Sequence, residues 1–149
     1  MSALRRAGPD DAGSIARLVQ RAYSKWIPLV GEEPKPLTAD YQRAVLDHEV
    51  WVVDGERGLA GVLELIPARD HVLVENVAVE PALQGRGLGR QLMAYAEAEA
   101  RSLGVGEVRL YTNERFADDL RFYERLGYEP FDRRPFGDSS LVFLAKKVA

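Results

Sequence analysis

Residues 75–93 read E-N-V-A-V-E-P-A-L-Q-G-R-G-L-G-R-Q-L-M, a pattern typical of an apolar strand, a short turn, a glycine-rich loop and the start of an amphipathic helix. Three glycines at every second position of 85–89 remove side chains from the loop, so backbone N–H groups can approach a ligand closely. The helix begins near Gly87, which adds unpaired N–H groups and a positive dipole end. Because Arg86 and Arg90 flank this point, the pattern predicts a pyrophosphate site.

Two common phosphate-binding loops do not fit the segment. A dinucleotide-binding fold requires G-x-G-x-x-G and an acidic residue about twenty positions later. Here the spacing is G-x-G-x-G, and the residues at that distance are Gly104 to Gly106. A Walker loop requires Gly-Lys-Ser/Thr, which the sequence lacks. A glycine-rich turn without a ligand remains the structural alternative.

The hexapeptide Q-G-R-G-L-G, residues 84–89, resembles the acetyl-CoA loop of the GNAT superfamily of N-acetyltransferases, written Q/R-x-x-G-x-G/A. F-Y-E-R-L-G-Y, residues 122–128, resembles the L-Y-x-x-x-G-F/Y motif of the same family. The resemblance implies acetyl-CoA as the acyl donor. The cofactor-binding residues that it implies are Val77, Ala78, Val79, Gln84, Gly85, Arg86, Gly87, Leu88, Gly89, Arg90, Asn113 and Tyr123.

In GNAT enzymes the strand before the loop bulges and separates from the next strand, which frees backbone groups for the pantetheine arm. The resemblance carries this to residues 77–79 and makes the N–H of Val77 or Ala78 the donor to the oxyanion. Because the sequence has no cysteine, no thiol acyl-enzyme can form. We therefore expect direct transfer within a ternary complex.

Tyr123 is the residue that the resemblance makes the catalytic acid. In the family, the hydroxyl of this tyrosine lies near the thioester sulfur and protonates the departing thiolate. The alternative is an aromatic core residue whose hydroxyl finds a hydrogen-bond partner.

Glu75 is the second catalytic candidate. It lies nine residues before Gln84, where many GNAT members carry a glutamate that acts as a base, often through water. Strand alternation would place Glu75 on one face with Val77 and Val79. The alternative is an ion pair with an arginine such as Arg109 on the neighbouring strand, and Asn76 and Glu80 are weaker candidates for the base.

Asn113 follows a predicted strand, where the family often places an asparagine against the cofactor. A turn residue is the alternative. The sequence departs from the family pattern nearby, because Phe116 and Asp119 stand where an asparagine and an alanine are common. This departure leaves Asn113 as the candidate for that contact.

The hydrophobic and turn patterns predict the order β-α-α-β-β-β-α-β-α-β-β. The predicted helices cover residues 10–24, 38–47 (capped by Thr38), 87–103 and 116–126; the strands cover 4–7, 50–53, 58–66, 71–80, 107–112, 128–131 and 139–147; and 26–36 form a proline-rich loop. The fold class is α/β (α+β), a GNAT-like mixed sheet of about seven strands flanked by about four helices. We expect a single domain over residues 1–149.

Composition restricts the function. Twenty basic and 23 acidic residues give a net charge of −3, which argues against nucleic acid as a partner. The absence of cysteine excludes disulfides and thiolate zinc sites, and two histidines are too few for a metal cluster, so we expect no metal. The sequence has no apolar run near 18 residues and no signal peptide, so we expect a cytoplasmic enzyme without membrane contact.

The acceptor is expected to be the amine of a small molecule. Tyr23, Trp26 and Tyr41 are candidates to line its pocket, although they equally fit the core of an apolar lid. Two further functions compete, a non-catalytic acyl-CoA-binding regulatory module and a protein N-acetyltransferase. A homodimer is left open.

Overall fold

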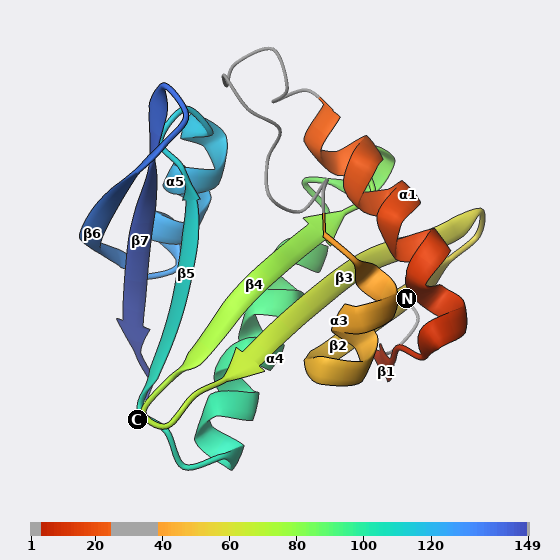
Figure 1. Ribbon diagram of the computed structural model, residues 1–149, viewed down its shortest axis with the longest axis horizontal. Helices are drawn as coiled ribbons and strands as arrows, with labels where there is room; N and C mark the ends of the chain where they lie inside the picture. Colours follow the sequence, from red (N-terminus) through yellow and green to blue (C-terminus); the bar gives the residue numbers. More distant parts are fainter. Residues whose placement is uncertain (1–3, 25–38, 149) are drawn as a thin grey trace.

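Seven strands form one mixed sheet in the computed structural model, which describes residues 4–24 and 39–148, and four α-helices lie against it (Figure 1). The elements are β1 (Arg5–Arg6), η1 (Pro9–Asp11), α1 (Ala12–Tyr23), α3 (Tyr41–Asp47), β2 (Glu49–Gly55), β3 (Gly58–Pro67), β4 (Val72–Val79), η3 (Pro81–Leu83), α4 (Leu88–Ser102), β5 (Glu107–Asn113), α5 (Ala117–Arg125), β6 (Glu129–Phe136) and β7 (Ser139–Lys147). The strand order is β1-β2-β3-β4-β5-β7-β6. The predicted fold class is confirmed. Within the described ranges, every helix is too short or too polar to span a lipid bilayer.

Most elements begin or end one or two residues away from the prediction, and three of the differences have a visible cause or size. A 3-10 turn takes up Pro9–Asp11, so α1 begins at Ala12. Asp40 caps α3, because its side chain accepts a hydrogen bond from the N–H of Arg43; the predicted cap Thr38 and the loop over residues 26–36 lie outside the described residues. Strand β6 continues to Phe136, five residues beyond the prediction.

The sheet carries an apolar core on each face. On one face α1 and α3 cover Val50, Val52 and Val62. On the other face α4 covers Leu63 and Leu65 with its own buried stripe. Figure 1 shows the sheet running between these two layers of helix. Burial on both faces holds β3 and β4 rigidly at the centre of the sheet.

Strands β4 and β5 pair for only a short distance. Parallel pairing joins Val72–Val74 to Val108–Leu110 and then stops, although β4 stays paired with β3 up to Val79. The two strands start side by side and then diverge (Figure 1). The β5 side of residues 75–79 therefore has no partner strand in the described parts of the chain. The carbonyl oxygen of Val79 accepts a hydrogen bond from Nε2 of Gln84 at 3.3 Å, and no strand of the described residues satisfies the other backbone groups of this edge.

A β-bulge lies where this divergence begins. Glu64 pairs with Asn76 and Leu65 with Val74, which leaves Glu75 as the extra residue on β4. A bulge of this kind changes which face the following side chains occupy.

The change of face is visible in the packing. Val74 before the bulge and Val77 and Val79 after it all contact the core on the α4 side, whereas Glu75 and Asn76 line a cavity beside α3. The expectation that Glu75 shares a face with Val77 and Val79 is therefore wrong, because strict alternation ignored the bulge.

Two carboxyl groups meet where α4 covers the β2 side of the sheet. The hydrogen bond with Glu49 raises the pKa of Glu99, and burial adds to the effect. The Oε1 atom of Glu49 is buried and has no hydrogen-bond partner. Deprotonation of Glu99 therefore places a negative charge close to the carboxyl group of Glu49.

We predict that Glu99→Gln raises the free energy of unfolding near pH 7 by about 0.5 kcal/mol, a small gain because the site is partly exposed. The folded protein binds this proton more tightly than the unfolded chain, so wild-type stability falls as pH rises above about 4.5. The gain in the variant should be close to zero at pH 4 and grow toward pH 8 in urea denaturation. An equal gain at both pH values would contradict the interpretation that the charge of Glu99 beside Glu49 destabilises the folded protein.

Candidate active site

The glycine-rich loop follows β4 and leads into α4. Gly85 and Gly87 have φ values of +82° and +88°, a region that favours glycine. A Cβ atom at either position would meet no heavy atom within 4 Å, so the loop needs these glycines for backbone conformation. Gly89 differs from both, since a Cβ there would lie in ordinary contact distance, 3.4 Å, from Cζ of Phe122 on α5.

A cavity of about 630 Å³ lies between this loop, the diverging end of β4, α1 and α5. Its lining residues are Ala22, Tyr23, Val77, Ala78, Val79, Leu83, Gln84, Gly85, Gly87, Gly89, Arg90, Asp118, Asp119, Phe122, Tyr123 and Arg125. The fold thus brings most of the predicted cofactor residues to one space. Of the others, Arg86 is exposed and Leu88 packs into the core.

Tyr123 lies in the wall of this cavity and is almost fully buried. Its ring makes edge contacts with Phe122 and Tyr128. Burial raises the pKa of the Tyr123 hydroxyl well above 10, and the charge of Asp119 adds to the shift. The phenol therefore stays protonated at neutral pH and is suited to donate a proton, while its packing also fits the core interpretation.

Glu75 has a different partner from the one expected. Its Oε1 accepts a hydrogen bond of 2.6 Å from the hydroxyl of Tyr111 on β5. Arg109 instead donates to Glu107 at 2.6 Å and lies 4.0 Å from Asp70. The predicted alternative, an ion pair between Glu75 and Arg109, is wrong. The sequence signal for Tyr111 was its place two residues after Arg109, on the same face of the strand.

Asn76, next to Glu75, joins both N-terminal helices to β4. The hydroxyl of Tyr23 on α1 donates to its Oδ1 at 3.3 Å, and its Nδ2 donates to the hydroxyl of Tyr41 on α3 at 3.0 Å. Burial raises the pKa of both tyrosines. Two of the three predicted acceptor residues thus lie beside the bulge, and the third, Trp26, lies outside the described residues.

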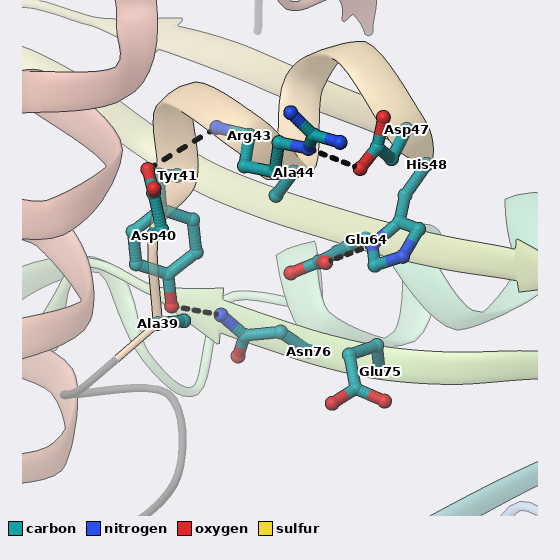
Figure 2. Close-up of a pocket in the computed structure, with 10 residues that line it drawn as sticks. All are labelled: Ala39, Asp40, Tyr41, Arg43, Ala44, Asp47, His48, Glu64, Glu75 and Asn76. Atoms are coloured by element: carbon teal, nitrogen blue, oxygen red, sulfur yellow. Dashed lines mark hydrogen bonds and ion pairs between the residues drawn. The ribbon is translucent and has the colours of Figure 1, made fainter.

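A second cavity, of about 210 Å³, lies between α3, β3 and β4 (Figure 2). Glu64 projects into it from β3 although it is almost fully buried. Its Oε2 lies 2.6 Å from Nδ1 of His48. Burial raises the pKa of Glu64, and the hydrogen bond with His48 opposes the shift. Sequence reasoning missed Glu64, whose signal is one carboxylate inside the apolar run G-V-L-E-L-I.

Comparison with known proteins shows the family. Residues 46–130 match the acetyltransferase (GNAT) domain. The chain belongs to the GNAT acetyltransferase family. The predicted resemblance is confirmed, and the matched residues contain the loop, both catalytic candidates and the second cavity's Glu64 and His48.

Among the relatives is the N-alpha-acetyltransferase 80 of Mus musculus, 43% identical over 79 residues, which cover 52% of this chain and 23% of that protein. The aminoalkylphosphonate N-acetyltransferase of Salmonella typhimurium is 41% identical over 56 residues, 38% of this chain and 36% of that enzyme. The chain spans only about a quarter to a third of the length of these two relatives.

Solved structures share the fold. A GNAT acetyltransferase from Desulfovibrio desulfuricans superimposes with a TM-score of 0.81 at 23% identity over the full length of both chains. The PaiA N-acetyltransferase from Thermoplasma acidophilum, solved with coenzyme A, gives a TM-score of 0.83 at 16% identity over 99% of both chains. At these identities the likeness is one of fold alone.

Both polar atoms of the Asn113 side chain are hydrogen-bonded within the protein. Its Nδ2 donates to Oγ of Ser139 at 2.8 Å, and its Oδ1 accepts from the N–H of Arg115 at 2.9 Å. It does not line the 630 Å³ cavity. These contacts favour the turn interpretation over a contact with a cofactor.

We predict that Tyr41→Phe lowers the free energy of unfolding by about 1–2 kcal/mol, because the buried Nδ2 of Asn76 loses its acceptor. Tyr23→Phe is the matched control, since it removes a longer hydrogen bond, 3.3 Å, to the other end of the same amide. Its cost should be below about 1 kcal/mol. Urea denaturation measures both; equal losses would mean that Asn76 does not depend on Tyr41.

Proposed function

We propose that the protein is an N-acetyltransferase that moves the acetyl group of acetyl-CoA to the amine of a small molecule, by direct transfer in a ternary complex. The observation that carries the proposal is the single cavity shared by the glycine loop, the free edge of β4 and the hydroxyl-bearing Tyr123.

Different parts of the cavity lining suit different parts of the donor. The N–H groups of residues 85–90 and the N-terminus of α4 suit a diphosphate, and Arg90 adds positive charge. The free edge of residues 77–79 suits the amide groups of a pantetheine arm. Coenzyme A in the PaiA complex and acetyl-CoA in the yncA structure of Salmonella typhimurium support this assignment.

The chemistry then needs three groups. Glu75 accepts a proton from the acceptor ammonium, directly or through water, so that the neutral nitrogen attacks the thioester carbon. The N–H of Val77 or Ala78 stabilises the oxyanion. As the C–S bond breaks, Tyr123 protonates the departing thiolate and later regains a proton from the acylated nitrogen.

The names of the relatives support both a small-molecule acceptor and a protein acceptor. The aminoalkylphosphonate enzyme and the mycothiol acetyltransferase of Streptosporangium roseum are named for small molecules. The mouse N-alpha-acetyltransferase and the fold neighbour named ribosomal-protein-S18-alanine N-acetyltransferase point to the protein-acetylating alternative. Release of CoA thiol with a panel of small amines and N-terminal peptides separates the two. If acetyl-CoA binds and none of these acceptors gives turnover, the non-catalytic regulatory module is the function that remains.

We predict that Tyr123→Phe lowers kcat at least about 100-fold with an acetyl-CoA Kd within about threefold of wild type, because only the proton donor is lost. Tyr128→Phe is the matched control, since its buried hydroxyl bonds Glu97 and does not line the cavity. The raised pKa of Tyr123 also predicts no fall in wild-type kcat from its ionisation below about pH 10. Equal kcat in both variants would exclude Tyr123 as the acid.

We predict that Gly87→Ala weakens acetyl-CoA binding at least about tenfold, because the strained residue moves the loop amides. Gly104→Ala carries a comparable strain, φ +76°, at the other end of α4. Both variants should lose about 1 kcal/mol of stability, and only the first should lose affinity in calorimetry. Unchanged affinity in Gly87→Ala would contradict a diphosphate site at this loop.

A further inference from the structure

The proposed reaction creates a proton that has to leave the protein. An ammonium nitrogen loses two protons when it becomes an amide, and the thiolate takes up one of them. One proton per turnover is therefore delivered to Glu75 and must reach solvent before the next cycle. Glu75 is only partly exposed, and its Oε1 is already held by the hydroxyl of Tyr111.

The second cavity offers a route away from Glu75. Glu75 lines it on β4, Glu64 lines it on β3, and His48 lines it at the end of α3 (Figure 2). A volume of about 210 Å³ with carboxylate and imidazole walls has room for several waters, each of which needs about 30 Å³ and two to four polar partners. Water in this space would connect the carboxyl group of Glu75 with that of Glu64.

The pair of Glu64 and His48 continues the route outward. Glu64 is about 95% buried, and its side chain meets His48 at 2.6 Å. The His48 side chain is 30% exposed, so the ring reaches from the buried carboxylate to solvent. A buried carboxylate is costly unless it is hydrogen-bonded, and the contact with Nδ1 of His48 supplies that hydrogen bond.

Other charged groups around the pair leave this route intact. The ionisable groups that face it from the neighbouring elements are Arg6, Asp40, Tyr41, Arg43, Asp47, Glu75 and Tyr111. Arg43 is paired with Asp47 at 2.8 Å, and Asp40 is bonded to the N–H of Arg43. Arg6 contacts the backbone oxygen of His48 and not its ring.

We propose that Glu64 and His48 form a proton relay that carries the proton of each turnover from Glu75 to solvent. The inference rests on the proposed function. Neither residue contacts the substrate, and both act through Glu75.

Each step of the relay balances. In the resting pair one proton lies between Oε2 of Glu64 and Nδ1 of His48, and Nε2 carries a second. The proton on Glu75 passes through cavity water to the other carboxyl oxygen of Glu64, the proton between the two residues moves onto Nδ1, and Nε2 releases its proton to bulk water. Rotation of the ring then turns Nδ1–H to solvent, where proton exchange restores the Nε2–H tautomer, and Glu64 again holds one proton against Nδ1. After a complete cycle, every group of the relay has the protonation state with which it began.

Imidazole rescue tests the relay. His48→Ala should lower kcat by at least about tenfold in dilute non-titrating buffer, and added imidazole should restore most of the rate by replacing the missing proton acceptor. The KM for acetyl-CoA and for the amine should stay within about twofold of wild type. His71→Ala is the matched control, because His71 is the only other histidine and pairs with Asp70 on the surface at 2.7 Å. It should match wild type with and without imidazole.

Glu64→Gln gives a second, independent arm. It keeps a hydrogen bond to His48 but cannot carry a proton, so its kcat should fall and should not respond to imidazole. The relay is overturned if kcat is unchanged in both variants, or if imidazole does not restore the kcat of His48→Ala. It is also overturned if the variants mainly raise the KM for the amine, because the cavity would then be an acceptor subsite. Absence of turnover in the wild type with every acceptor would instead defeat the proposed function itself.

Discussion

The early end of the pairing between β4 and β5 is the constraint on which the site depends. After Val74 the two strands separate, and among residues 4–24 and 39–148 no strand pairs with the β5 side of residues 75–79. The cavity, the exposed strand edge and the entrance to the glycine loop all follow from this one departure from regular pairing. The bulge at Glu75 contributes to it, because an extra residue increases the local twist of β4.

Packing on either side keeps the separation in place. The α4 side is filled by buried residues such as Leu92 and Met93, which lie against β3 and β4. On the opposite side the contact is polar, since Asn76 binds a tyrosine from each of two helices. Polar bonds of this kind are directional, so they fix the position of β4 more narrowly than apolar contact alone would. The bulge is thereby held at a defined distance from α1 and α3.

The sequence predicted what depends on local chemistry. The glycine loop and the order of the elements follow from spacing and periodicity, the mixed sheet of about seven strands follows from that order, and they agree with the structure. Three things depend on tertiary contacts and were missed: the change of face after Glu75, the hydroxyl of Tyr111 as its partner, and the cavity around Glu64. A bulge leaves no mark in an alternating sequence such as V-L-V-E-N-V-A-V, because the apolar pattern survives the shift. The second half of β6 was not predicted as a strand, because both faces of β6 are exposed and its sequence shows no apolar alternation.

That exposed strand has a consequence for solubility. Strand β6 closes the sheet on one side, and an open edge of eight residues would ordinarily invite the strands of other molecules. Its sequence E-P-F-D-R-R-P-F sets two prolines without N–H groups and three charged side chains in its interior along that edge. A neighbouring chain would meet interrupted hydrogen bonding and buried charge, so this edge is a poor template for sheet-to-sheet pairing.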